Sequence, residues 1–401
     1  MLRRLALLLA PIALIACADG PTAPSGDAAL LRADRLPPAG ARGLTVMTRN
    51  LYLGGDIFAI VPPSPTPLPV RVAQLWQQIL ASNFPERAGA IADEIAENAP
   101  HLVGLQEVPI YRIDPVSDAI VGGTRPASVV ALDFLAELQA ALAARGLCYD
   151  VASVATLSDI EMPMLVATTP APRFSDIRYT DRDVILARCD VPTSDPHSGV
   201  YTARLSLTVS GVPVTVLRGW TSVLATVGGV TYRFVNTHLE VDAFAPIQLA
   251  QARELIAILA GETRPVVLVG DFNSPADGSR TATYGVLLAE GGFVDAWSEA
   301  HPNDPGLTSG LPADLFGPPE LETRIDLVLV RYGFHASPSA GIVGGVHADV
   351  IGEELEDRTA SLRWPSDHAG VVVTLHAPKA IGKETAVAGG NGKGKALGRN
   401  K

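Results

Sequence analysis

Acidic, amide and imidazole side chains stand beside short apolar runs at six places in this 401-residue sequence. These residues are Asn50; Glu107; Asn236 and His238; Asp271 and Asn273; Asp326; and Asp367 with His368. A polar side chain next to a buried strand loses hydration energy unless it is hydrogen-bonded or bound to a metal ion. One such place is usually a cap or a turn, but six are hard to explain in that way. We therefore expect a reactive site near Asp271 and His368.

This set of groups suits the transfer of a phosphoryl group to water. The reaction needs the charge of the phosphate neutralised, a water deprotonated and a leaving oxygen stabilised. Carboxylate and amide oxygens favour Mg²⁺, Mn²⁺ or Ca²⁺ over zinc, which prefers more His and Cys ligands. The sequence shows no GxSxG elbow, no Ser-His-Asp order, no P-loop and no GxGxxG motif. The residues thus favour a metal-dependent hydrolase of phosphate esters.

The elements that must position these residues alternate between strand-like and helix-like patterns. Strands are predicted at 43–50, 102–105, 184–187, 200–209, 212–217, 223–227, 230–235, 266–270, 325–330 and 371–375. Helices are predicted at 86–98, along the leucines of 132–142, and at 248–259. The prolines of 61–69 exclude regular structure there. Strands and hairpins interleaved with helices predict a layered α/β sandwich rather than a doubly wound parallel sheet.

Five short motifs resemble the motif series of the endonuclease/exonuclease/phosphatase superfamily and occur in the same order. They are Leu105-Gln106-Glu107, Asn236-Thr237-His238-Leu239, Gly270-Asp271-Phe272-Asn273, Arg324-Ile325-Asp326-Leu327-Val328 and Pro365-Ser366-Asp367-His368-Ala369. One of these motifs alone is a weak signal, whereas five in series are a strong one. The resemblance implies a four-layered α/β sandwich, in which two mixed β-sheets pack face to face between flanking helices.

The resemblance also implies which residues handle the metal and the water. Glu107 would be the main metal carboxylate, with Asn50 near it and Asp367 as a further metal residue. Asp271 would polarise the attacking water, and Asn273 would hold this water or the phosphate. Asn50 also fits a plain turn residue, and Asp367 a plain cap.

Contacts with the substrate phosphate are implied in the same way. His238 and His368 would contact phosphate oxygens and stabilise charge in the transition state. Asp326 would orient His368 and fix its tautomer, as a carboxylate partner does. Asn236 is a further candidate for the phosphate. Arg182 is another, through a forked contact, although a surface ion pair fits it equally.

The N-terminus has the pattern of an export signal. Arg3 and Arg4 precede an apolar run over 5–16, which is too short to span a bilayer and predicts a signal peptide over residues 1–16. The end of the run resembles a bacterial lipobox, so Cys17 is expected to be lipidated and to begin a flexible tether over 17–43. Ordinary signal cleavage is the alternative. The prediction is an envelope lipoprotein, placed at the outer membrane or cell surface rather than the inner membrane.

The remaining sequence is expected to form one catalytic domain over 44–378, followed by a basic tail over 379–401. The net charge of −11 disfavours a protein that grips nucleic acid mainly through counterion release. In an oxidising compartment Cys148 and Cys189 either pair or stay as two buried thiols. His101 and His197 lie in loop-like sequence and are expected in solvent.

The substrate class stays broad at this level. An exported phosphodiesterase, such as a nuclease that scavenges nutrients, is favoured over a phosphomonoesterase. A sphingomyelinase-like or inositol-phosphate phosphatase is the alternative among enzymes. A non-catalytic binding lipoprotein, the alternative from another class, predicts loss of Glu107, Asp271, Asp326 or His368, yet all four are present. The protein is expected to be a monomer.

Overall fold

The computed structural model describes residues 43–332 and 345–376. The predicted signal peptide, Cys17, the tether up to residue 42 and the basic tail lie outside the described residues. Among the helices of the described part, none is both long and apolar enough to cross a membrane.

Within residues 43–332 and 345–376, two large sheets and one small hairpin make up the β structure. Sheet A runs in the order β15 (Val346–Ile351), β16 (Gly370–His376), β1 (Gly43–Asn50), β2 (Leu102–Gln106), β6 (Arg173–Arg188), β3 (Ile110–Asp114), β4 (Val129–Asp133), with β5 (Tyr149–Ala167) also paired to β6. Sheet B runs in the order β13 (Val294–Asp295), β14 (Asp326–Tyr332), β12 (Pro265–Asp271), β11 (Val230–His238), β10 (Gly219–Val227), β7 (Thr193–Val200). The hairpin of β8 (Leu205–Val209) and β9 (Val212–Val216) pairs with neither sheet.

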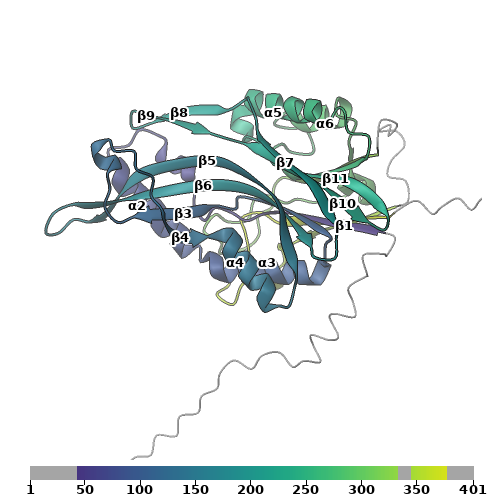
Figure 1. The fold of residues 1–401 in the computed structure, drawn as a ribbon, viewed down its shortest axis with the longest axis horizontal. Coiled ribbons are helices and arrows are strands. Elements are labelled where there is room, and N and C mark those ends of the chain that lie inside the picture. The colour runs from purple at the N-terminus through teal and green to yellow at the C-terminus, as the bar shows by residue number, and fades with distance from the viewer. Residues whose placement is uncertain (1–42, 333–344, 377–401) are drawn as a thin grey trace, which may run out of the picture. The chain divides into compact units, whose positions relative to one another are not determined.

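Helices cover the outer faces of the two sheets (Figure 1). On sheet A lie α2 (Leu68–Ala81), α3 (Phe84–Asn98) and α4 (Phe134–Ala144), whereas α5 (Ala245–Ile258) and α6 (Thr283–Ala289) lie on sheet B. Short elements complete the set: α7 (Ala296–Ala300), η1 (Ile57–Ile60), η2 (Ala119–Val121), η3 (Asp242–Phe244) and η5 (Leu355–Asp357). A third apolar core fills the space between the sheets, from Val46 on β1 to Val269 on β12. The predicted four-layered α/β sandwich is confirmed.

Several elements differ from the sequence prediction. Helix α2 was missed because prolines surround its start, yet proline fits the first turn of a helix, where the N–H has no partner anyway. Strands β5 and β6 are far longer than predicted and form one long antiparallel hairpin. Leu132 belongs to β4, and α4 begins only after Asp133, whose side chain accepts from the N–H groups of Leu135 and Ala136.

The strand directions explain why distant residues meet. β1 and β2 are parallel neighbours in sheet A, as β11 and β12 are in sheet B, so the C-terminal ends of each pair lie at one edge. β14 runs antiparallel to β12, which places Asp326 at the start of its strand directly beside Asp271. Asp326 therefore begins its strand, and Asp367 and His368 precede theirs. Asn50, His238 and Asp271 end their strands, whereas Glu107 and Asn273 follow theirs.

A disulfide joins Cys148 and Cys189. These residues stand just before β5 and just after β6, so the bond ties the two ends of the long hairpin together.

His101 is buried, which corrects the expectation that it lies in solvent. Its Nδ1 accepts from the backbone N–H of Thr45 at 3.0 Å, and its Nε2 has no partner among the described residues. Burial, followed by the positive charge of Arg188, lowers the pKa of His101 to about 4. The imidazole is therefore neutral in the folded protein, whereas the unfolded chain takes up a proton below about pH 6.5.

Acid should therefore destabilise the fold through His101. The stability contributed by the neutral His101 ring is fully present above pH 6.5. As the pH falls toward 4, the free energy of unfolding decreases by up to about 1.4 kcal/mol per pH unit. Between pH 8 and pH 5, urea unfolding should show that the wild type loses about 2 kcal/mol more than His101→Asn. The matched control is His197→Asn, since His197 is exposed. Equal losses in the wild type and His101→Asn would contradict this account.

Candidate active site

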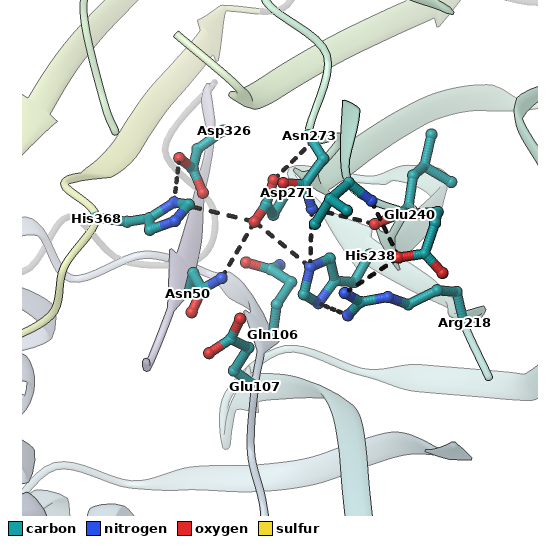
Figure 2. Close-up of polar contacts among 12 residues, drawn as sticks. Asn50, Gln106, Glu107, Arg218, His238, Glu240, Asp271, Asn273, Asp326 and His368 are labelled. Carbon is teal, nitrogen blue, oxygen red and sulfur yellow. Dashed lines mark hydrogen bonds and ion pairs between the residues drawn. The ribbon is translucent and has the colours of Figure 1, made fainter. Parts of the chain in front are cut away.

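Six of the ten residues predicted for the metal, the catalysis and the phosphate line one pocket of about 930 Å³, open mouth included. They are Glu107, His238, Asp271, Asn273, Asp367 and His368. Asn50 and Asp326 are buried and each contacts a lining residue. Figure 2 shows Asp271 at the centre, between His368 on one side and His238 on the other.

Asp271 ends β12 and is held by two donors. Its Oδ2 accepts from Asn50 Nδ2 at 3.1 Å, and its Oδ1 accepts from the backbone N–H of Asn273 at 2.8 Å. Burial and then the negative charge of Asp326 raise the pKa of Asp271 to about 6, against the lowering effect of His368. A carboxylate with a pKa near the working pH is suited to accept a proton from water.

His368 carries a positive charge. Its Nδ1–H donates to Asp326 Oδ2 at 2.9 Å, and this oxygen also accepts from the Thr308 hydroxyl at 2.7 Å. Burial opposes the charge on the ring, but the carboxylates of Asp326, Asp367 and Asp271 outweigh it and hold the pKa of His368 well above its usual range. The site therefore has a fixed cation at neutral pH.

His238 has the opposite state. Burial, Arg218 and His368 hold the pKa of His238 well below its usual range, so its ring is neutral. Arg218 NH1 lies 2.9 Å from His238 Nδ1, and a guanidinium can only donate. The ring proton therefore sits on Nε2, which lies 3.5 Å from Asp271 Oδ2, an oxygen that can accept it. The Asn273 amide nitrogen, 3.1 Å from Nε2, only donates and cannot accept this proton. The site thus has one cationic and one neutral imidazole.

Two buried arginines hold the loops that carry these groups. Arg49 pairs with Glu94 at 2.8 Å and donates to the backbone carbonyl of His368. The other is Arg87 on α3. Because Arg49 lies on β1, the pair fixes the backbone of His368 against the central strand of sheet A.

Arg87 connects the two sides of the pocket. Its NH1 donates to the carbonyls of Leu51 at 2.6 Å and Pro365 at 2.9 Å, and its side chain is fully buried. Leu51 follows Asn50, and Pro365 precedes Asp367 in the chain. One guanidinium therefore sets the spacing between the segment after β1 and the segment before β16.

The acidic residues fit a divalent cation. Glu107 Oε2 accepts from the N–H of Leu53 at 2.7 Å, while Oε1 has no partner among the described residues. Burial raises the pKa of Glu107 to about 7, and the negative charge of Asp367 adds to this rise because the two carboxylates repel each other. Oxygen donors of this kind suit Mg²⁺. Asp271, Asp326 and His368, rather than Glu107 and Asp367, form a group of three with ligand atoms close together, although hydrogen bonding already links Asp326 and His368.

Asn236 does not line the pocket, which corrects its predicted contact with phosphate. Its Nδ2 donates to the carbonyls of Leu105 at 2.8 Å and Val184 at 3.1 Å, and its Oδ1 accepts from Gln106 Nε2 at 2.6 Å. The amide is thus saturated between the two sheets and joins β11 to β2 and β6 beneath the site.

Arg182 is also placed elsewhere. Its guanidinium pairs with Asp133 and donates to the carbonyl of Val108 at 2.9 Å. It faces away from the pocket because side chains alternate along β6. The ion-pair alternative for Arg182 is the one that the geometry fits.

Several charged or polar residues near the pocket were not predicted from the sequence. Tyr179, Asp181 and Arg218 line the pocket, and burial raises the pKa of Asp181 to about 6 against the effect of Arg218. Asp183 is fully buried, and neither of its carboxyl oxygens has a partner among the described residues. Had the strand been extended back from residue 184, the alternation of Tyr179, Asp181 and Asp183 would have placed all three on one face.

Comparisons with known proteins find one matching family model and several similar solved structures. The model of the endonuclease/exonuclease/phosphatase family matches residues 79–368. Similar solved structures include truncated TDP2 of Caenorhabditis elegans, with 17% identity, a TM-score of 0.46 and coverage of 84% of this chain and 98% of that one. An endonuclease/exonuclease/phosphatase from Beutenbergia cavernae has 20% identity, a TM-score of 0.49 and coverage of 84% and 72%. A mannosyl-6-phosphatase of Bacteroides thetaiotaomicron has 18% identity, a TM-score of 0.44 and coverage of 82% and 98%. Among curated proteins, none matches the chain.

Proposed function

Since the chain belongs to the endonuclease/exonuclease/phosphatase family, we propose that it is a divalent-metal-dependent phosphodiesterase that acts outside the cytoplasm. The observation that carries the proposal is the set Asp271, His238 and His368: a carboxylate with a raised pKa lies between one neutral and one cationic imidazole. Environments that push the pKa values of neighbouring groups apart assign the acid and the base of a site.

The residues of the site divide the work as follows. Asp271 takes a proton from the attacking water, and Asn273 holds this water or a phosphate oxygen. The water oxygen forms the new P–O bond, the bond to the leaving oxygen breaks, and the leaving group departs as an oxyanion that takes its proton from solvent. His238, through Nε2–H, and the cation of His368 stabilise the negative charge that spreads over the phosphate oxygens in the transition state. Arg218 acts through His238 by keeping its proton on Nε2.

Glu107 and Asp367 would hold the cation, with Asn50 beside them. A bound divalent ion polarises a phosphate oxygen and offsets charge that accumulates during the reaction. Asn50 has a second role on its own account: its oxygen accepts from the N–H of Tyr52 at 2.8 Å, and its nitrogen donates to Asp271. It therefore aligns the catalytic carboxylate whether or not it contacts the ion.

The proposal places the protein in the bacterial envelope as a lipoprotein anchored through Cys17. Support comes from the basic start, the short apolar run and the Leu14-Ile15-Ala16-Cys17 sequence. The disulfide between Cys148 and Cys189 agrees with export, because such bonds persist in oxidising compartments. Incorporation of labelled lipid that persists in Cys17→Ser would remove the anchor from the proposal.

The test is hydrolysis of bis-p-nitrophenyl phosphate, with plasmid DNA and sphingomyelin as further substrates. With Mg²⁺ present we expect p-nitrophenolate release, and with excess EDTA we expect a loss of at least about 100-fold, restored by added Mg²⁺. Turnover that is unchanged by EDTA contradicts the metal dependence. Absence of turnover on every phosphate ester contradicts the proposed function itself.

A further inference from the structure

An apolar cavity of about 700 Å³, open mouth included, lies next to the catalytic pocket. Three elements wall it: helix α2 with Leu75 and Trp76, the long β5–β6 hairpin with Met162, and the β8–β9 hairpin with Leu207 and Val214. The lining side chains are apolar or aromatic throughout. Such a cavity takes up hydrocarbon and has little to offer a charged group.

The cavity and the catalytic pocket share a boundary. Ile57, Phe58, Ile160, Tyr179 and Val216 line both of them. A molecule with its phosphate between His238 and His368 therefore has carbon-lined space directly adjoining its own polar end. The catalytic pocket is rich in acidic and basic groups, so the two spaces differ sharply in what they accept.

The cavity is covered by two segments that lie outside the two large sheets. The β8–β9 hairpin pairs with neither sheet, and η1 is a single short turn that precedes α2. Arg71 on α2 ties both covers together, since its guanidinium donates to the carbonyl of Ile60 at 2.7 Å and to the hydroxyl of Ser210 at 3.1 Å. One arginine side chain therefore holds both covering segments.

We propose that this cavity binds a hydrocarbon chain on the substrate, so that the preferred phosphate esters are amphiphilic ones with a single-chain alkyl or acyl group. The inference rests on the proposed function, because it assigns the chain to the ester that the catalytic residues cleave. The shape of the site selects a molecule with one polar end and one apolar end. A nucleic acid or a sugar phosphate has no group that gains by entering a carbon-lined cavity.

Two series of probes test the inference on the full-length protein, each below its critical micelle concentration. The first is binding of methyl-, butyl- and octylphosphonate by calorimetry with Mg²⁺ present. The dissociation constant should fall roughly three- to fourfold per methylene until the cavity is filled. The second is hydrolysis of methyl and octyl p-nitrophenyl phosphate, for which kcat/KM should rise with chain length in the same direction.

Val214→Trp fills the cavity from β9 and should lower the methyl-to-octyl ratio of dissociation constants at least tenfold. Its control is Thr215→Trp, which adds the same side chain on the same strand but at an exposed position, and should keep the wild-type ratio. Thermal melts by circular dichroism check that both variants fold. Leu207→Ala enlarges the space and should move the preferred chain to a greater length.

Equal binding of methyl- and octylphosphonate overturns the inference, and so does a chain-length effect that Val214→Trp leaves intact. In both cases hydrolysis of bis-p-nitrophenyl phosphate would leave the proposed function standing. Absence of hydrolysis of every ester overturns both proposals. A chain-length preference that Val214→Trp removes and Thr215→Trp keeps supports the cavity as its source.

Discussion

Asp271→Asn should lower kcat/KM for bis-p-nitrophenyl phosphate by about 10²- to 10⁴-fold, the usual contribution of a positioned general base. Asparagine has the same shape as aspartate but cannot take a proton from water. In the wild type, activity should rise as the pH passes through about 6, because the carboxylate form of Asp271 is the active one. The residual activity of Asp271→Asn should lack this rise. Initial rates between pH 5 and pH 8 measure both effects.

The control for this variant is Asp277→Asn, the same change at an exposed position in the segment after β12. It should retain wild-type activity. Circular dichroism melts check that both variants fold. Activity of Asp271→Asn within tenfold of the wild type, in a folded protein, would remove Asp271 from the role of base.

Asp326→Asn should change the pH dependence of activity rather than abolish it at every pH. Asp326 raises the pKa of His368 by its charge and its hydrogen bond, so the variant should lower that pKa. Below the new pKa the cation persists and activity is largely kept. Above it the ring is neutral and kcat should fall by about 10²- to 10³-fold, the usual loss when one donor to the transition state is removed.

His368→Gln supplies the comparison, because it should lose this activity at all pH values. Asp349→Asn, at an exposed position on β15, should match the wild type. A measurement of the His368 ring pKa by NMR in the wild type and Asp326→Asn separates the electrostatic effect from a change in structure. An unchanged pH profile in Asp326→Asn would show that Asp326 does not govern the charge of His368.

The core of the fold was predictable because its strands are continuous apolar runs. β1 and β12 were located almost to the residue, since both are buried on two faces and end in a polar group. β5 was missed because one of its faces lies toward helices and the other is partly exposed, so its apolar residues follow no single period. Its strand structure depends on the pairing with β6, which contains bulges and cannot be seen along the sequence. Helix α2 was not predicted because the prolines at its start were taken to exclude regular structure, whereas they lie in its first turn.

The site was predictable where a motif names a residue, and less so where a contact depends on direction. Asp271, His238 and His368 meet in the pocket as expected. Asn236 did not, because its place inside β11 points it between the sheets rather than toward the pocket. Arg218 carries no motif that marks it. Its role depends on the antiparallel pairing of β10 with β11, which sets Gly219 opposite His238 and is invisible along the chain.

The β8–β9 hairpin has a consequence for how readily this protein can change. Its hydrogen bonds close upon themselves, so insertions, deletions or exchanges within it break no ladder of either large sheet. The catalytic groups, by contrast, lie at or beside the ends of strands that belong to the two large sheets. Evolution and protein engineering can therefore change the β8–β9 hairpin, and with it the choice of substrate, independently of the catalytic residues. The two large sheets must be kept intact for the chemistry.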